Sequence, residues 1–436
     1  MHVKNLNKLP KDILDLIYRI GKACDRGRVR GFVVGGFVRD LYLGIANLDL
    51  DIVLEDNAVE FAKELVEELG THLICHHRFK TATICTFEKH KLDIATARKE
   101  IYEHPAALPI IEPSTIFEDL KRRDFTINTL AFSINKDDFG TLIDYFNGLA
   151  DLKKKNIRIL HELSFIDDPT RILRAIRFET RFNFKIEPDT LRLLKKSFRL
   201  NLLEKVEKQR IRDEIILLLK EKNPVACIKR IDDLIDFNFI HPRIEVDYKL
   251  LEAVSKQISW FNINFPKKRA LDSWLLYFIA LLDKLSNDDI SHILRNFCFR
   301  RGESKRIRDY KSNVDKLIAR LSKRTLNPSD IYKILEPLSY ELTIMIRAKT
   351  LAHHHIKKNK IIASHIHNFF NIYNGQRLSV NGKDISNLGF KPGPYFKDIL
   401  KKTLYAKIDG RLLSNLDEME YLKACARKYI NKNRKT

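Results

Sequence analysis

The stretch GFVVGGFVRD occupies residues 31–40, and LDLDIVLE follows at residues 48–55. The first opens with an apolar, β-rich run that ends in two glycines, which predicts a buried strand running into a tight turn. In the second, acidic and apolar residues alternate, which predicts a further strand. Amphipathic helices are expected on either side, over residues 9–27 and 57–70. More strand-like runs follow at residues 72–77, 82–87, 91–96, 127–134 and 141–146.

The chain changes character at about residue 155 of its 436 residues. Beyond that point glycine is scarce and Leu, Ile, Lys and Arg recur at helical spacing, so residues 163–370 are expected to be almost wholly helical. Residues 99–118 contain three prolines and no regular period, and we predict a loop there. The expected fold class is therefore α+β, with a mixed-sheet domain near residues 1–150 followed by helices.

The composition restricts the class of partner. Lys and Arg number 79 and Asp and Glu 57, which is a formal net charge of +22. Such an excess points to a polyanionic partner, with nucleic acid first. The six cysteines lie far apart without a CxxC pair, which argues against a disulfide framework and favours a reducing, cytoplasmic location. No apolar run approaches the ~20 residues that a membrane span needs, so no membrane partner is expected.

The strand at residues 48–55 carries candidate metal ligands. Asp49 and Asp51 are alternate residues and should project side by side, and paired carboxylates suit Mg²⁺ carried with a triphosphate. Asp93 adds a third carboxylate if its strand lies alongside, and three could hold two metal ions for displacement at phosphorus. The turn at Gly35 and Gly36 lets backbone N–H groups approach phosphate oxygens. Each feature alone also fits a solvated strand edge or a plain turn, but their combination favours a site.

A second constellation is RRDFTIN at residues 122–128. Two adjacent arginines, Arg122 and Arg123, could hold a triphosphate by forked hydrogen bonds. Asp124 and Asn128 could meet a ribose hydroxyl. The alternative is a helix N-terminus that Asp124 caps, with solvated arginines.

The third constellation is DDPTRILRAIR at residues 167–177. Pro169 suits a first helical turn with Asp167 or Asp168 as the cap. Asp168 and three arginines then recur at three-residue steps, which slip ~60° per step and form a winding row rather than one flat face. Asp168 and Arg171 together could bond a base edge. The alternative is a surface helix with ion pairs along it. The arginines of the row are Arg171, Arg174 and Arg177.

In this order, the three blocks resemble the class II tRNA nucleotidyltransferases, which include CCA-adding enzymes, A-adding enzymes and bacterial poly(A) polymerases. GGFVRDLYLG with LDLDIVLE resembles the family's metal-binding motif, RRDFTINTLAF its ribose-selecting motif and DDPTRILRAIRF its nucleotide-template motif. The resemblance runs through about residues 30–200. It implies a polymerase-β-like nucleotidyltransferase head followed by an all-α neck, body and tRNA-binding tail. The corresponding ranges are residues 1–150, 151–215, 216–345 and 346–436.

The resemblance also implies roles for the residues. Gly36 and Arg39 would contact the incoming nucleotide, beside the turn at Gly35. Asp49 and Asp51 would bind Mg²⁺ and activate the 3′ hydroxyl of the RNA, with Asp93 as a further catalytic candidate. Arg123 would hold phosphate and Asp124 or Asn128 the ribose 2′ hydroxyl. Asp168 and Arg171 would read the base edge, so that protein is the template. Arg174 and Arg177 would hold triphosphate or primer backbone.

The implied reaction is transfer of CMP and AMP from CTP and ATP to the 3′ end of tRNA, with release of pyrophosphate. CCA addition is the first expectation, addition of only the terminal A to tRNA ending in CC is the alternative, and poly(A) polymerase is less favoured. In this family a loop at residues 99–120 is needed to add A, and here it looks full length, which argues against a CC-only enzyme. A small-molecule nucleotidyltransferase would need neither the basic arm nor the template residues.

Two regions depart from the family pattern or go beyond it. Asp167 stands where the family usually has Glu, and Gln209-Arg210-Ile211 stands where it usually has ERI, although Glu214 remains. Farther on, a basic run is expected on one helix, either as a solvated face or as a contact for RNA phosphates. Its residues are Arg300, Arg301, Lys305, Arg306 and Arg308.

Overall fold

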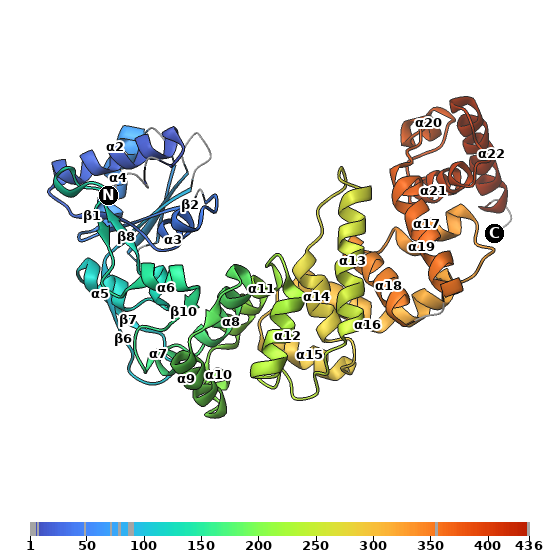
Figure 1. Ribbon diagram of the computed structural model, residues 1–436. Helices are drawn as coiled ribbons and strands as arrows, with labels where there is room; N and C mark the ends of the chain where they lie inside the picture. The colour runs from blue at the N-terminus through green and yellow to red at the C-terminus, as the bar shows by residue number, and fades with distance from the viewer. Residues whose placement is uncertain are drawn as a thin grey trace. The chain divides into compact units, whose positions relative to one another are not determined.

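The computed structural model describes residues 6, 8–47, 49–69, 72–76, 80–85, 91–353 and 356–433 (Figure 1). The predicted strand ends at His77, Thr86 and Phe87 lie outside these residues. The chain divides into two compact units, Met1–Phe239 and Ile240–Thr436. The finer boundaries predicted at residues 150, 215 and 345 stay predictions.

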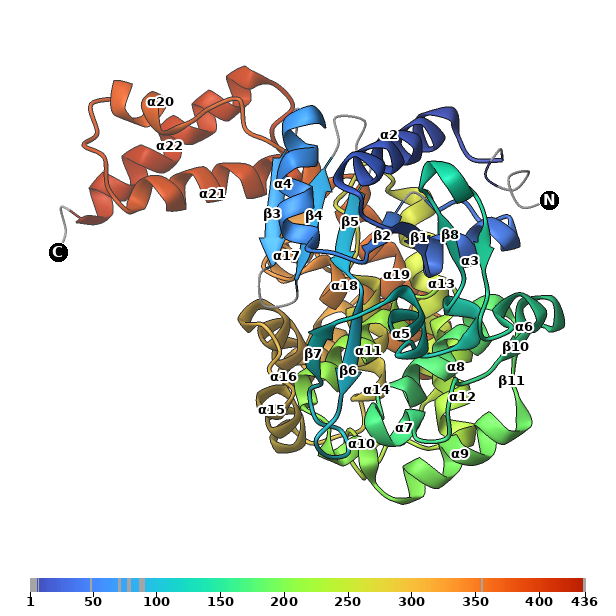
Figure 2. The ribbon, with the colours of Figure 1, turned by 90° about the vertical axis from the view of Figure 1, so that its left-hand side faces the viewer.

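A seven-stranded sheet organises the first unit (Figure 2). Strands β2 and β5 pair in parallel and the other neighbours pair antiparallel, so the predicted mixed sheet is confirmed. The order across the sheet is β3 (His72–His76), β4 (Thr81–Cys85), β5 (Lys91–Thr96), β2 (Asp49–Leu54), β1 (Gly31–Val34), β8 (Ala131–Ser133) and β9 (Leu142–Ile143).

Side-chain alternation gives the sheet two different faces. Phe32 and Val34 of β1 and Val53 of β2 point to one face, where they form a buried cluster with Ile116 and Leu120. Those two residues belong to α5 (Ile116–Lys121), so α5 covers this face. Asp49 and Asp51 share the alternation of Val53 and therefore project from the same face as α5. The sheet thus directs its acidic strand end toward the segment that follows α5.

The remaining helices of the sheet region cover its strands and edges. Helix α4 (Ala58–Leu69) packs on β3, β4 and β5, and α3 (Gly36–Leu43) contacts β1 and β2. Helix α2 (Lys11–Gly27) approaches the sheet at Gly21, where an added Cβ would lie 2.2 Å from the carbonyl oxygen of Ile134. Only glycine permits that approach, so the residue fixes how the first helix docks.

The predicted loop at residues 99–118 is wrong. This segment contains an antiparallel hairpin of β6 (Arg98–Ile101) and β7 (Ile110–Pro113), and then the start of α5. Two prolines lie in the connecting turn and the third ends β7, so none occupies the interior of a strand. An ion pair from Glu100 to Arg122 joins the hairpin to the residue that follows α5, while the Glu100–Arg98 pair lies within β6. Local periodicity carries no sign of the contact with Arg122.

The first unit ends in helices, as predicted. A short parallel pair, β10 (Asn156–Ile157) with β11 (Lys185–Ile186), interrupts them. Helix α8 follows its N-cap Thr170, so Pro169 precedes the first turn instead of lying in it. The helices are α6 (Gly148–Lys154), α7 (Ser164–Asp167), α8 (Arg171–Phe182), α9 (Pro188–Arg199), α10 (Leu202–Lys205), α11 (Lys208–Leu219) and α12 (Pro224–Leu234).

The described part of the second unit is helical. Its centre is α14, which is apolar on all sides and buried from Trp274 to Leu281 because α13 and α18 pack against it. The last three helices enclose a cluster of their own around Ile385, Ile399 and Leu422. Among the described helices, none is long and apolar enough to span a bilayer. The helices are α13 (Tyr248–Asn264), α14 (Ser273–Leu281), α15 (Asn287–Asn296), α16 (Arg301–Leu321), α17 (Pro328–Leu335), α18 (Tyr340–His353), α19 (Ile356–Asn371), α20 (Gly382–Asn387), α21 (Tyr395–Ile408) and α22 (Asn415–Asn433).

Candidate functional site

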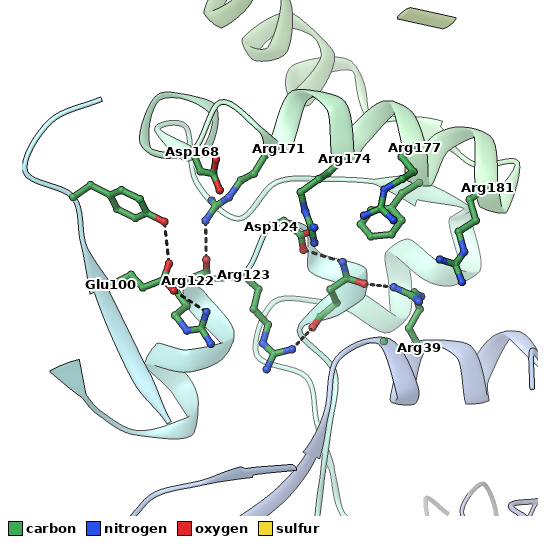
Figure 3. Close-up of a pocket in the computed structure, with 14 residues that line it drawn as sticks. Arg39, Glu100, Arg122, Arg123, Asp124, Asp168, Arg171, Arg174, Arg177 and Arg181 are labelled. Carbon is green, nitrogen blue, oxygen red and sulfur yellow. Dashed lines mark hydrogen bonds and ion pairs between the residues drawn. The ribbon is translucent and has the colours of Figure 1, made fainter. Parts of the chain in front are cut away.

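A cavity of about 490 Å³ in the first unit gathers residues of the second and third constellations, together with Gly36 and Arg39 (Figure 3). The predicted metal ligands Asp49 and Asp51 are not among its lining residues. Seven arginines and three carboxylates line it, so its formal charge is 7 − 3 = +4. An excess of guanidinium groups around a cavity of this size favours a polyphosphate ligand. The lining residues are Gly36, Arg39, Glu100, Tyr102, Arg122, Arg123, Asp124, Asn128, Asp168, Arg171, Arg174, Arg177, Phe178 and Arg181.

Helix α8 supplies a row of arginines along the cavity. Arg171, Arg174 and Arg177 lie side by side in Figure 3, and Arg181 continues the row one turn later. The Phe178 ring lies 5.6 Å from the Arg174 guanidinium carbon and 4.9 Å from that of Arg177, so an aromatic face supports both cations. The predicted row is confirmed, but its partners lie on other elements rather than along the helix. The surface-helix alternative is therefore wrong.

Asp124 connects α8 to the sheet region. Its Oδ2 accepts from Arg174 Nε at 2.9 Å and Nη2 at 2.5 Å, and its Oδ1 accepts from Asn128 Nδ2 at 2.8 Å. Arg39 Nη1 then donates to Asn128 Oδ1 at 2.5 Å. Burial alone would raise the pKa of Asp124, but Arg174 and the Asn128 amide lower it to about 2. The residues predicted to meet the ribose thus also hold two arginines in place.

Arg122 and Arg123 follow the C-terminus of α5, and both pair with the buried Asp119, at 2.7 Å and 2.9 Å. The two arginines are therefore not solvated, and Asp124 does not cap a helix. The alternative of a helix N-terminus capped by Asp124 is wrong. Arg122 also pairs with Glu100 at 2.9 Å. Burial would raise the pKa of Asp119, but the two arginines lower it. Arg122 is thereby held by two carboxylates. Arg123 Nη1 lies beside Gly35 and donates to the carbonyl oxygen of Asn128 at 3.4 Å.

The fold needs glycine at only one of the two positions of the turn. Gly35 has φ +69°, and an added Cβ would lie 2.5 Å from Arg123 Nη1. An added Cβ on Gly36 would meet no described protein atom closer than 3.5 Å. The fold therefore requires glycine at Gly35, whereas Gly36 borders the cavity and leaves room there for a ligand.

Asp168 and Arg171 occupy one end of the cavity. Among the described residues, the hydrogen bonds that reach Asp168 end on Oδ1: from Thr170 N at 3.1 Å, Thr170 Oγ1 at 2.6 Å and Arg210 Nη2 at 2.8 Å. These donors set the orientation of the carboxylate and leave Oδ2 to accept from a ligand. Arg171 donates to Ser164 Oγ at 2.6 Å and to the carbonyl oxygen of Arg122 at 2.8 Å. A base edge could meet this acceptor and this donor together.

The altered motif lies on α11, whose side chains contact the arginine row and Asp168. Glu214 accepts from Arg174 Nη1 at 3.1 Å and lies 3.6 Å from Arg177 Nη2. Arg210 fixes Asp168, while Gln209 is exposed. Replacement of an acidic residue by Gln209 therefore removes no contact to the arginine row.

The candidate metal ligands lie on β2 and β5. Asp51 and Asp93 are direct partners in the parallel register, as predicted. Burial, followed by the charge of Asp93, raises the pKa of Asp51 to about 6, against the lowering effect of Arg123. Asp93 is occupied by Thr83 Oγ1 at 2.6 Å and Lys91 Nζ at 2.5 Å.

Asp49 and Asp51 fit a hard cation as a pair. Within the described ranges, no group of three Asp, Glu, His or Cys side chains is arranged to hold a metal ion. Mg²⁺ needs only one or two carboxylates when phosphate oxygens and water complete its octahedron. A cation there would favour the ionised form of Asp51 and so oppose burial, the main cause of its raised pKa. The catalytic role of Asp93 stays a prediction.

Sequence reasoning missed several residues of the cavity. Arg181 follows Arg177 at a four-residue step, so the helical spacing could have revealed it. Tyr102 and Glu100 lie on the hairpin that was predicted to be a loop, with Tyr102 donating to Glu100 at 2.9 Å. Arg210, which lies outside the lining, was named only as part of the altered motif, and its contact with Asp168 had no local signal because it spans 42 residues.

The basic run on α16 is partly internal. Arg306 lies 2.5 Å from Asp272 and 3.5 Å from Glu341, and Lys305 pairs with Asp309 at 2.5 Å. Arg300, Arg301 and Arg308 are exposed. Contact with RNA by this run stays a prediction.

Comparison with known proteins gives consistent matches. A model of the poly A polymerase head domain matches residues 31–158, and one described as the probable RNA- and SrmB-binding site of polymerase A matches residues 183–247. An A-adding tRNA nucleotidyltransferase of Geobacter sulfurreducens is 34% identical over 96% of the chain, which spans 48% of that protein's length. An A-adding tRNA nucleotidyltransferase of Halalkalibacterium halodurans is 32% identical, with 97% of this chain and 94% of the relative covered.

A solved structure of the Thermotoga maritima CCA-adding enzyme in complex with tRNA is also similar. It has a TM-score of 0.71 and 35% identity, and the match covers 97% of this chain and 98% of that one. The likeness therefore extends from the sheet region through the last helices.

Proposed function

This chain belongs to the class II tRNA nucleotidyltransferase family, and from that membership and the arginine-lined cavity we propose that it adds nucleotides to the 3′ end of tRNA. The proposed donors are CTP and ATP, and the product is the CCA end. The observation that carries the proposal is Asp168 beside Arg171 at one end of a cavity of charge +4. That pairing offers one acceptor and one donor for a base, as a protein template requires.

The proposed mechanism assigns binding and orientation to the residues of the cavity. Asp49 and Asp51 would hold Mg²⁺, which when bound neutralises phosphate charge and makes the attacking hydroxyl more acidic. Arg123, braced through Asp119, faces the turn at Gly35 and Gly36 and would bind phosphate oxygens. The α8 arginines keep the site positive where charge accumulates during transfer. Catalysis then rests on position and charge, without a covalent intermediate.

Addition of the terminal A alone is the second candidate. The relatives from Geobacter sulfurreducens and Halalkalibacterium halodurans, at 34% and 32% identity, are both A-adding enzymes. Both candidates share the transfer of AMP to RNA ending in CC, so they differ only in whether CMP is also accepted.

A primer-extension experiment separates the candidates. One tRNA transcript is prepared ending at the discriminator base, after one C and after CC, and each is incubated with protein, Mg²⁺ and CTP or ATP. Growth of the first transcript to full CCA establishes CCA addition. Extension of only the CC-ended transcript, by one A, establishes the A-adding alternative. No extension of any transcript would refute the proposed function.

A further inference from the structure

Asp40 is a buried carboxylate that the proposed mechanism does not use. It is 1% exposed and does not line the nucleotide cavity. Its Oδ1 accepts from Arg39 Nε at 2.8 Å and lies 2.7 Å from Arg39 Nη2, so it compensates a guanidinium that is itself buried. Its Oδ2 accepts from Asn47 Nδ2 at 2.9 Å. One oxygen is thus engaged by α3 itself, and the other by the connection from α3 to β2.

Asn47 joins Asp40 to the backbone of Asp49. The Oδ1 of Asn47 accepts from the Asp49 N–H at 3.0 Å, while its Nδ2 donates to Asp40. A side-chain amide has an acceptor and a donor on the same planar group, so two such bonds fix its orientation. A single amide therefore ties the first residue of β2 to a buried group on α3.

The first half of β2 has a strand on only one side in the described register. Strand β5 pairs with β2 along its whole length. Strand β1 pairs only with Ile52, Val53 and Leu54, because it ends where the turn at Gly35 begins. Residues 49–51, which include both candidate metal ligands, extend beyond it. A strand end that is paired on one side opens more readily than one paired on both sides, so the bridge from Asn47 supplies support where it is needed.

The same bridge leads to the nucleotide cavity. Arg39 lines that cavity (Figure 3), and its Nη1 donates to Asn128 Oδ1 at 2.5 Å. From the Asp49 N–H to Arg39, through the two side chains between them, each link is a hydrogen bond of 3.0 Å or less. A proposed metal ligand and a proposed nucleotide contact are therefore connected by side chains that do not line the cavity.

We propose that Asn47 is a positioning residue for the transfer reaction. Acting through Asp40, it holds Asp49 in place relative to Arg39, so that Mg²⁺ can meet the Asp49 carboxylate and the phosphates of the nucleotide together. Groups one step behind the ligands of a metal commonly control its affinity in this way. The inference rests on the proposed function, since it takes Asp49 to be a ligand of Mg²⁺.

The test measures how far Mg²⁺ strengthens ATP binding, in the absence of RNA and therefore without transfer. Isothermal titration calorimetry gives the ATP affinity with Mg²⁺ and with EDTA, and the ratio of the two is the Mg²⁺ effect. The test variant is Asn47→Ala. The matched control is Asn57→Ala, just beyond the other end of β2, where the Asn57 Oδ1 also accepts from a backbone N–H two residues ahead, that of Val59 at 3.2 Å.

The expected result is a loss confined to the contribution of the metal. Asn47→Ala should reduce the Mg²⁺ effect about tenfold, because Asp49 is less firmly held. Its ATP affinity with EDTA should stay within about twofold of wild type, since Arg39 keeps its carboxylate partner. Single-turnover extension of RNA ending in CC, at saturating ATP and Mg²⁺, should slow about tenfold or more. Asn57→Ala should match wild type in all three measurements.

Exchange of the two side chains provides a rescue. Asn47→Asp keeps the acceptor for the Asp49 N–H but loses the donor and brings two carboxylates together, so the Mg²⁺ effect should fall. Asp40→Asn/Asn47→Asp has the same carboxylate at position 47 and a donor at position 40, so the link forms again and most of the Mg²⁺ effect should return. A role of Asn47 in the local turn alone predicts no difference between these two variants, because both keep the acceptor.

Three outcomes would overturn the inference. One is a Mg²⁺ effect in Asn47→Ala equal to that of wild type, and another is an equal Mg²⁺ effect in Asn47→Asp and in the exchanged double variant. The third is wild-type protein that binds ATP equally well with Mg²⁺ and with EDTA. Failure of the proposed function is separate, because it shows as wild-type protein that extends no RNA while ATP binding still responds to Mg²⁺ and to Asn47→Ala.

Discussion

Arg174 donates two hydrogen bonds to one oxygen of Asp124, from Nε and Nη2 to Oδ2 at 2.9 Å and 2.5 Å. The two residues are 50 positions apart, on α8 and on the segment after α5. The pair joins the helix that begins at the proposed template residue Arg171 to the segment that faces the sheet's carboxylates. Arg174 also pairs with Glu214, and the combined charge of the two carboxylates raises its pKa against the effect of burial.

This pair predicts acid-sensitive stability of the first unit. The pKa of Asp124 falls from 3.8 to about 2 on folding, so the folded state keeps the carboxylate ionised where the unfolded chain binds a proton. The stabilisation, about 2 kcal/mol, is complete above pH ~4 and is lost as the pH falls toward 2. Asp124→Asn should remove this part of the pH dependence. Urea unfolding at several pH values, followed by circular dichroism, measures this dependence. Tryptophan fluorescence would not, because Trp260 and Trp274 both lie in the second unit and report on that unit alone. Parallel pH curves for the two proteins would contradict the assignment.

The two glycines of the turn form a matched pair of variants. Gly35→Ala should destabilise the protein by about 1–3 kcal/mol, because its positive φ is strained for alanine and the new methyl group would strike Arg123. Gly36→Ala should leave stability nearly unchanged but weaken ATP binding about tenfold or more, since only a ligand comes close there. Thermal unfolding and ATP titration measure the two effects. Equal ATP affinity in Gly36→Ala and wild type would remove Gly36 from the nucleotide site.

Asp49→Ala should abolish nucleotide transfer, with a loss of at least about 10³-fold, because the pair that holds Mg²⁺ is broken. RNA affinity should stay within about twofold of wild type, since phosphate contacts supply it. Asp56→Ala, an exposed aspartate just beyond the other end of β2, is the control. Single-turnover extension of RNA ending in CC, with anisotropy for binding, gives both values. Turnover like that of wild type in Asp49→Ala would refute the metal assignment.

Arg210 is expected to act through Asp168. Arg210→Ala removes one of the hydrogen bonds that orient the Asp168 carboxylate. Discrimination between correct and incorrect nucleotides should therefore fall about tenfold, with little change in RNA affinity. Arg210→Lys should restore part of it by keeping one donor to Oδ1. Arg212→Ala on the same helix, which removes a donor to Asp213 and no residue of the cavity lining, should leave this discrimination unchanged. The ratio of kcat/KM values for ATP and GTP is the readout, and an unchanged ratio in Arg210→Ala would show that Asp168 needs no such support.

The ion pairs of the hairpin show where sequence patterns stop being informative. Glu100 and Arg122 are 22 residues apart, and they pair where a proline-rich segment forms two paired strands. Local periodicity reports the faces of single elements, and it contains no record of a partner on another element. For the same reason Arg122 was expected among the phosphate ligands, whereas Asp119 and Glu100 occupy it.

The sequence by itself determined the elements that bear the site. Strand β2 with Asp49 and Asp51, the glycine turn and the arginine row of α8 all follow from short-range patterns, since apolar spacing and glycine conformation act within a few residues. Only the tertiary structure decided which carboxylate pairs with which cation or hydrogen-bond donor. Asp124 fixes Arg174, Arg210 fixes Asp168, and Asp93 belongs to Lys91 and Thr83, because ion pairs form between whichever groups the packed elements bring within reach.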